Sequence, residues 1–191
     1  MIDEAANAAE PAGLRDGGIG ASAASADIVT QSGVALHIRP AVPGDESLLA
    51  TLFSQVSPED LRFRFASTKA QVAQQDLARM LPAADGKTTT FLALLADGVP
   101  VGAATLADDP DGKTAEVALS VHSAWKKKGV AWTLLDHTLR YASAHGLKEV
   151  KSFESGDNRA AINLEHEMGF VARLVSASPV ELSLSKNVSA D

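Results

Sequence analysis

The sequence predicts an α/β fold in which helices flank a mixed, mostly antiparallel central sheet. Residues 89–121 hold three consecutive strand-like segments joined by short turns rich in Asp and Gly, which is typical of antiparallel neighbours. After residue 129 the apolar spacing changes to the three and four of a helix. The full order of strand, helices, three strands, helix, strand, helix and strand indicates a mixed α/β sheet.

The first two elements are predicted from their apolar spacing. Leu36 and Ile38 alternate with polar residues and predict a strand that Pro40 ends. Asp45 is expected to cap a helix whose apolar residues recur at helical spacing. These residues are Leu48, Leu49, Leu52, Phe53 and Val56.

Further helix and strand signals continue through the middle of the chain. Ser57 before a proline predicts the start of a second helix, and a polar helical stretch is expected over residues 68–80. Strands are predicted at residues 89–95, 99–106 and 113–121.

The C-terminal third alternates between the two periodicities. A helix is predicted from residue 130 to about His145, with Gly146 as its stop, and a strand over residues 149–154. A short helix is expected to open at residues 157–158 and to stop at Gly169. A closing strand is predicted over residues 180–184.

Length and composition exclude several classes of protein. The chain has 191 residues, no Cys and 46% hydrophobic residues, which predicts one domain and excludes disulfide scaffolds, thiolate metal sites and a Cys nucleophile. The net charge of −7 argues against nucleic-acid partners. No long apolar run and no secretory signal are present, so we expect a cytoplasmic protein without a membrane partner.

The first 33 residues differ in composition from the rest. They are rich in Ala, Gly and Ser, and they carry five acidic residues against one arginine. We therefore expect residues 1–33 to form an unstructured tail, residues 34–187 the domain and residues 188–191 a short C-terminal tail. An N-terminal helix that docks on a partner remains an alternative, and so does a homodimer.

The segment from Lys126 to Ala131 indicates a phosphate site. A glycine turn that leads into a helix presents free backbone N–H groups at the positive end of the helix dipole. Gly129 allows close approach of the main chain, and lysines at 126–128 raise the local potential. The alternative reading of this segment is a solvated basic loop that caps a helix.

This segment and three others, in the same order, resemble the GNAT family of acetyl-CoA-dependent N-acetyltransferases. The four motifs are Lys126-Lys127-Lys128-Gly129-Val130-Ala131, Asn158-Arg159-Ala160-Ala161 with Gly169-Phe170, Val99-Pro100-Val101-Gly102, and Ile38-Arg39-Pro40-Ala41 with Gly44-Asp45. The resemblance covers about residues 36–185. It implies splayed strands that form an acetyl-CoA cleft, acetyl-CoA as cosubstrate, an amine acceptor and no metal.

The resemblance also implies roles for particular residues. Glu116 would be the base that takes a proton from the amine; its alternative role is that of an exposed strand carboxylate. A strand bulge at residues 119–121 would free main-chain groups for the pantetheine arm, and Asn158 would serve at that arm or as a helix cap. The residues implied to bind the coenzyme are Leu119, Val121, Lys126, Lys127, Gly129, Val130, Ala131 and Asn158.

The expected function is acetyl transfer to a primary amine, and the finer resemblance indicates a protein lysine side chain. Ser57-Pro58-Glu59 with Arg64-Phe65, and Ala115-Glu116-Val117-Ala118, are similar to bacterial protein-lysine acetyltransferases. A small-molecule amine acetyltransferase and a non-catalytic acyl-CoA-binding regulatory module remain alternatives. The general acid is unassigned, because Glu165 occupies the position where many members carry a tyrosine.

Overall fold

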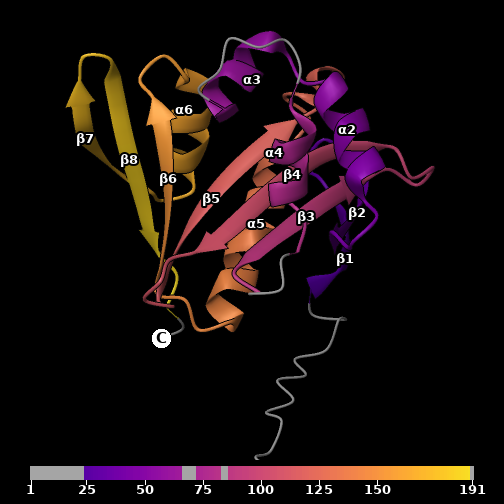
Figure 1. The fold of residues 1–191 in the computed structure, drawn as a ribbon, viewed down its shortest axis with the longest axis horizontal. Coiled ribbons are helices and arrows are strands. Elements are labelled where there is room, and N and C mark those ends of the chain that lie inside the picture. The colour runs from indigo at the N-terminus through magenta and orange to yellow at the C-terminus, as the bar shows by residue number, and fades with distance from the viewer. Residues whose placement is uncertain (1–23, 66–71, 83–85, 190–191) are drawn as a thin grey trace, which may run out of the picture.

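The computed structural model describes residues 24–65, 72–82 and 86–189. Eight strands form one sheet in the order β1-β2-β3-β4-β5-β6-β8-β7 (Figure 1). The strands are β1 (Ala26–Val29), β2 (Ala35–Pro40), β3 (Thr88–Leu94), β4 (Pro100–Asp108), β5 (Thr114–Val121), β6 (Glu149–Ser155), β7 (Val171–Ala177) and β8 (Val180–Asn187). The helices are α2 (Glu46–Ser54), α3 (Pro58–Phe65), α4 (Gln74–Arg79), the 3-10 turn η1 (Ser123–Trp125), α5 (Val130–Ala144) and α6 (Arg159–Glu167).

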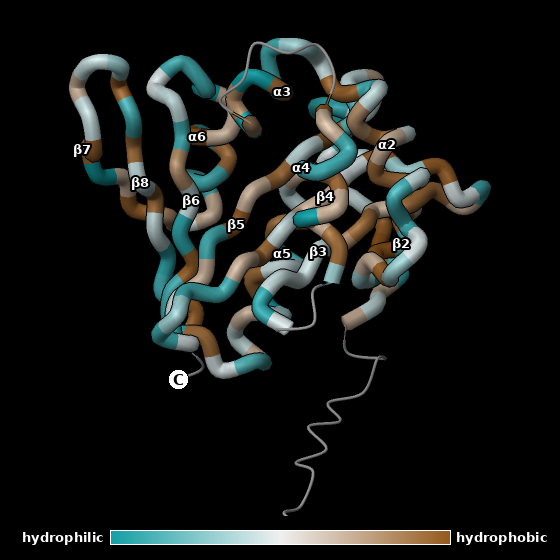
Figure 2. The backbone as a smooth tube through the Cα atoms, in the orientation of Figure 1, coloured by the Kyte–Doolittle hydropathy of each residue, from teal (hydrophilic) through white to brown (hydrophobic). Residues whose placement is uncertain are grey.

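The fold class is confirmed, and the helices cover the two faces of the sheet separately. Helices α2 and α4 pack on one face, which we call the front face, around a core that includes Leu92 and Ala103. Helices α5 and α6 pack on the back face, where Leu135 of α5 shares a core with Leu184 of β8. The apolar residues of the central strands run through the middle of the molecule (Figure 2).

Strand β5 shows the predicted alternation. Ala115 and Val117 are buried against α5 on the back face, whereas Glu116 is exposed on the front face. Gly102 on the neighbouring β4 allows α5 to come close, since a Cβ there would lie 3.2 Å from Val130 Cγ1. The sequence therefore places one carboxylate on a central strand whose other residues are uncharged.

The one parallel strand pair in the described sheet is short. Strands β5 and β6 pair only over Thr114–Glu116 and Glu149–Lys151, and beyond these residues they diverge. We call this point of divergence the fork. It lies in the middle of the sheet, between the antiparallel β1–β5 group and the antiparallel β6–β8–β7 group.

The folded part of the chain begins earlier and ends later than predicted. Residues 26–29 pair with β2 as an edge strand, so the prediction of a tail through residue 33 is wrong for this segment. Ile28 supplies the apolar contact that holds it, because its side chain packs against the back-face core. At the other end Val188 is buried and its N–H donates to the Lys148 C=O, so the C-terminal tail cannot start there.

Three further predictions about local structure are corrected or left open. Asp45 does not cap α2 with its side chain, because its carboxylate accepts two hydrogen bonds from Arg39 and one from the Val42 N–H. Strand β7 was not predicted, since both of its faces are exposed and the sequence therefore lacks an alternating pattern. Part of the helix expected over residues 68–80 lies outside the described residues, and α4 forms only from Gln74.

No helix in the described parts of the chain is both long and apolar enough to cross a bilayer.

Ser57 does cap α3 as predicted, because its Oγ accepts a hydrogen bond from the Asp60 N–H at 3.2 Å. Asp60 is thereby fixed at the first turn of α3, on the side that faces the fork.

Candidate active site

A cleft of about 470 Å³ opens at the fork between β5 and β6. Its walls come from β5, the loop before α5, the start of α5, β6, α6 and α3. The lining includes every residue that the sequence assigned to the site: Glu116, Leu119, Val121, Lys126, Lys127, Gly129, Val130, Ala131 and Asn158. Residues from three separate segments of the chain are therefore brought to one cavity.

The edge of β5 that faces the fork carries unpaired main-chain groups. In an antiparallel ladder, the N–H and C=O of alternate residues point to the same neighbouring strand. His122 N–H donates to the Val101 C=O, and the Thr114 C=O accepts from the Asp109 N–H, so the even-numbered residues of β5 face β4. The odd-numbered Leu119 and Val121 therefore face the fork, where the described chain offers them no partner strand.

The predicted bulge at residues 119–121 is wrong. Strand β4 pairs with β5 without a register shift from Gly102 opposite Val121 to Asp108 opposite Ala115. The free groups arise instead because β6 diverges from β5. An extended ligand in the fork can bind them as an added strand would.

The N-terminus of α5 supplies a row of free backbone donors. The first intrahelical hydrogen bond runs from Thr133 N–H to the Gly129 C=O, so the N–H groups of Val130, Ala131 and Trp132 have no acceptor within the helix. Gly129 has a φ of 77° and turns the chain into the helix. These groups, together with the dipole of the helix, are suited to a phosphate or diphosphate.

The lysines before α5 contribute less free charge than their number suggests. Lys126 Nζ lies 2.8 and 2.7 Å from the two carboxylate oxygens of Asp60 on α3. Lys128 Nζ lies 4.5 Å from the centre of the Trp125 ring, which is a cation–π contact. Lys127, with a φ of 60°, also lines the cleft. An anion placed at this loop would therefore meet mainly backbone N–H donors.

The N-terminal hairpin supports this loop from behind. Ser32 Oγ donates to the Lys128 C=O at 2.6 Å. A Cβ on Gly129 would lie only 3.0 Å from Thr30 Cβ, so the two segments are in close contact. Sequence reasoning missed this support, because Thr30 and Ser32 fall in the segment that was expected to be a tail.

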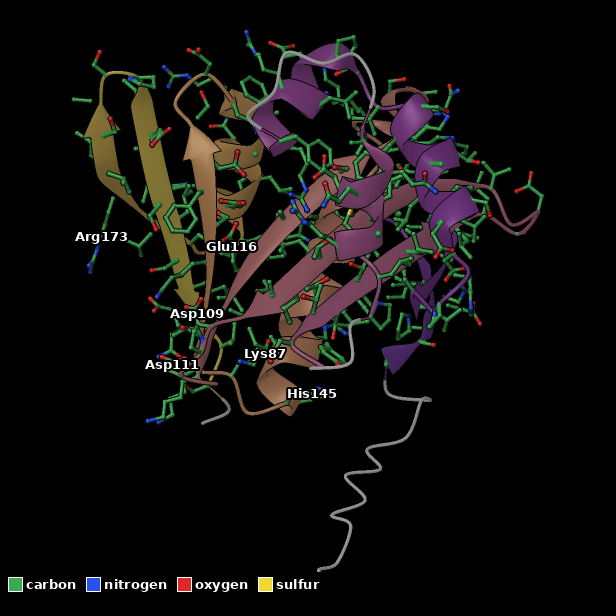
Figure 3. All side chains as sticks on the ribbon, viewed as in Figure 1. Lys87, Asp109, Asp111, Glu116, His145 and Arg173 are labelled. Carbon is green, nitrogen blue, oxygen red and sulfur yellow. The ribbon has the colours of Figure 1, made fainter. Side chains whose placement is uncertain are left out.

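Glu116 stands at the fork with charged neighbours. It is exposed and lines the cleft, and its register partner on β6 is Lys151. Figure 3 labels Glu116 on β5, beside β6. Arg64 of α3 lines the same cleft; burial lowers the pKa of its guanidinium, and the carboxylates of Glu116 and Glu154 oppose that effect. Sequence reasoning singled out Arg64 in a resemblance motif with Phe65 but did not assign it to the site.

Asn158 both caps α6 and lines the cleft. Its side chain accepts a hydrogen bond from the Ala161 N–H at 3.4 Å, while its Nδ2 donates to Glu154 Oε2 at 2.7 Å. Burial raises the pKa of Glu154 to about 6, although the hydrogen bond from Asn158 acts in the opposite direction. The amide is thus held in one orientation by a carboxylate that also borders the cleft.

Glu165 is a buried carboxyl group in the wall formed by α6. Only 2% of the residue is exposed, and its Oε2 accepts a hydrogen bond from Ser152 Oγ at 2.6 Å. Burial raises the pKa of Glu165 to about 7, and the nearby carboxylate of Glu154 contributes in the same direction. One signal in the sequence points to it, since Glu165 lies at helical spacing from Ala161 and Met168 in the inward stripe of α6.

A family model described as "Acetyltransferase (GNAT) family" matches residues 56–170. The structure is also similar to solved structures at low sequence identity. The GNAT domain of S. lividans PAT has a TM-score of 0.78 and 22% identity, over 85% of this chain and 96% of that one. The spermidine N-acetyltransferase from Vibrio cholerae, in complex with CoA and spermine, has a TM-score of 0.65 and 18% identity, over 80% and 95%. A phosphinothricin acetyltransferase from Sinorhizobium meliloti, in complex with AcCoA, has a TM-score of 0.68 and 15% identity, over 81% and 89%.

Proposed function

The chain belongs to the acetyltransferase (GNAT) family, whose enzymes use acetyl-CoA, and we propose that its acceptor is the side-chain amine of a protein lysine. In this proposal the amine attacks the thioester of acetyl-CoA directly. The single observation that carries it is that the unpaired edge of β5, the N-terminus of α5 and Glu116 line one cleft.

The groups along the cleft match the diphosphate, the pantetheine arm and the thioester of the coenzyme, in that spatial order. The N–H groups at the start of α5 and the positive-φ turn at Gly129 suit the diphosphate. The free main-chain groups of Leu119 and Val121 suit the amides of the pantetheine arm. An arm that follows β5 from its C-terminal end brings the thioester to Glu116, where β6 closes the fork.

Glu116 is the base in this proposal. A lysine amine has a pKa of about 10.4 and is almost entirely protonated at neutral pH, so it needs a group that takes its proton. Glu116 is exposed to solvent and lines the cleft, so it can take that proton directly or through water.

An open surface beside the cleft supports an acceptor of protein size. Lys151 pairs with Glu116 and shares its face of the sheet, and so does Phe153 two residues further along β6. Phe153 is 57% exposed and lines the cleft. In the part of the chain that the structure describes, no helix covers this face of β6, β8 and β7 (Figure 1).

The test is an acceptor panel with acetyl-CoA as donor. We expect acetyl-CoA to raise the melting temperature and free CoA to be released with a lysine-containing protein or peptide, with acetylation located by mass spectrometry. Release only with spermidine or phosphinothricin would overturn the lysine acceptor and leave a small-molecule acetyltransferase. A thermal shift without turnover on any amine would indicate a binding module.

A further inference from the structure

We propose that Arg64 selects the acceptor, by binding an acidic side chain that lies within two residues of the acceptor lysine. This inference rests on the proposed function, and it narrows the substrate class to lysines with a flanking Asp or Glu. It concerns a cation that lines the cleft and that neither the diphosphate site nor the base uses.

Helix α3 brings Arg64 to the end of the cleft where the amine reacts. The first turn of α3 is tied to the diphosphate side, because Asp60 forms an ion pair with Lys126. Arg64 is the next-to-last residue of the same helix, and it lines the cleft together with Glu116. Of the carboxylates that act on Arg64, that of Glu116 acts most strongly. The guanidinium therefore lies on the side of the base.

The guanidinium is supported by an aromatic ring and has free donors. Its Cζ lies 5.2 Å from the centre of the Phe65 ring, and Phe65 packs edge-on against Phe53 of the front-face core. An arginine that rests on a ring in this way keeps its planar N–H edge open to a carboxylate. Among the residues that the structure describes, none forms a hydrogen bond or an ion pair with Arg64. Its N–H groups are therefore available to a ligand in the cleft.

The positive charge of Arg64 is only partly compensated by the protein. Carboxylates act on it from three elements, namely Glu116 of β5, Glu154 of β6 and Asp76 of α4. Burial lowers the pKa of the guanidinium, and the pKa stays lowered although these three carboxylates oppose that effect. A further carboxylate at the N–H edge would supply the partner that a half-buried charge requires.

These charges decide which lysine fits best. An ammonium group that approaches Glu116 also approaches Arg64, which repels it. An acceptor segment with an acidic side chain beside the lysine presents the opposite charge to each group, the ammonium to Glu116 and the carboxylate to Arg64. Residues within two positions of the lysine lie within about 7 Å of it along an extended chain, so their side chains can reach the same cleft.

The experiment uses pairs of lysine peptides with acetyl-CoA as donor. The two members of a pair differ only in Asp against Asn, or Glu against Gln, at one of the two positions on either side of the lysine. We expect the wild type to prefer the acidic member of at least one pair by roughly 10-fold in kcat/KM, through a lower KM. In Arg64→Gln the acidic peptide should fall to the level of its amide partner, while the Kd for acetyl-CoA stays that of the wild type.

Arg62→Gln is the matched control on the same helix. The Cζ of Arg62 also lies 5.2 Å from a ring, that of Phe63, but Arg62 is exposed and does not line the cleft. This variant should keep the wild-type preference. Arg64→Lys retains the charge without the planar donors and should keep part of the preference. Arg64→Gln should melt no lower than Arg62→Gln, which separates recognition from a structural role.

The outcomes separate this inference from the proposed function. Equal kcat/KM within every pair, or a preference that persists in Arg64→Gln, would overturn the inference and leave the lysine acceptor in place. If a free amino acid is acetylated and no lysine peptide is, with a loss in Arg64→Gln alone, the lysine acceptor fails while carboxylate binding by Arg64 stands. Calorimetric titration of the same peptides in the presence of CoA needs no turnover, and equal Kd values within every pair would also overturn the inference.

Discussion

Ser32 Oγ donates a hydrogen bond of 2.6 Å to the Lys128 C=O, although 96 positions separate the two residues. The bond joins the β1–β2 hairpin to the loop that leads into α5. Thr30 packs against Gly129 in the same place, and the Ala24 C=O is hydrogen-bonded to His137 of α5. The N-terminal segment therefore supports the loop that we assign to the diphosphate.

Removal of the hairpin should weaken both the fold and the binding of acetyl-CoA. A chain without residues 1–33 loses β1, its ladder to β2 and the contacts of Thr30 and Ser32. We expect a lower melting temperature and a higher Kd for acetyl-CoA than in a chain that lacks only residues 1–23. Equal stability and affinity of the two truncated chains would show that the hairpin gives no support.

Gly129→Ala should destabilise the protein more than a comparable glycine substitution elsewhere. A left-handed conformation costs a residue with a Cβ about 1–2 kcal/mol, and at position 129 the Cβ also meets Thr30 at 3.0 Å. Gly112→Ala is the matched control, because its φ is 63° and no atom lies within 4 Å of the added Cβ. Urea unfolding of both variants measures the difference, and a Gly129 variant no less stable than the Gly112 variant would contradict the close contact.

Glu116→Gln should separate binding from turnover. The isosteric amide cannot take a proton, so we expect kcat to fall roughly 100-fold or more while the thermal shift with acetyl-CoA is retained. Glu181→Gln, an exposed strand carboxylate outside the cleft, should leave both unchanged. Unchanged turnover in the Glu116 variant would place the base elsewhere.

The raised pKa of Glu165 also predicts how stability changes with pH. The folded state binds this proton more tightly than the unfolded state, because burial raises the pKa from 4.5 to about 7. Its favourable contribution is complete below 4.5 and is lost as the pH rises through about 7. Relative to Glu165→Gln, the wild type should lose up to about 3 kcal/mol of unfolding free energy between these limits. Parallel stability curves for the two proteins would contradict the shift.

Most of the order of strands and helices could be predicted from the sequence, because the spacing of apolar and polar residues indicates which face of an element is buried. Strand β5 is the clearest case, with Val117 inward and Glu116 outward. Two strands with little burial, β1 and β7, were not predicted from the sequence. β1 has only four residues and one large inward apolar residue, Ile28, and β7 is exposed on both faces, so neither gives a clear strand signal in the sequence.

In the candidate site too, local features could be predicted from the sequence and contacts between distant segments could not. Glycine at a positive φ and a helix start are local features, so the loop around Gly129 could be predicted from adjacent residues. The Asp60–Lys126 ion pair joins helix α3 to the loop before α5, 66 positions further along the chain, and a local pattern cannot contain it. The free edge of β5 was expected from a bulge, but it results from the position of β6, which depends on the packing of α5 and α6 against the sheet.

The brief parallel ladder between β5 and β6 has a mechanical consequence. On either side of it the strands are bound into continuous antiparallel ladders, so the fork is the seam along which the molecule can open with the smallest loss of backbone hydrogen bonds. A ligand bound in the fork would contact both strand groups, β1–β5 and β6–β8–β7, and would hold them together. When it leaves, the C-terminal unit of β6, α6, β7 and β8 should exchange its amide hydrogens sooner than the rest of the sheet.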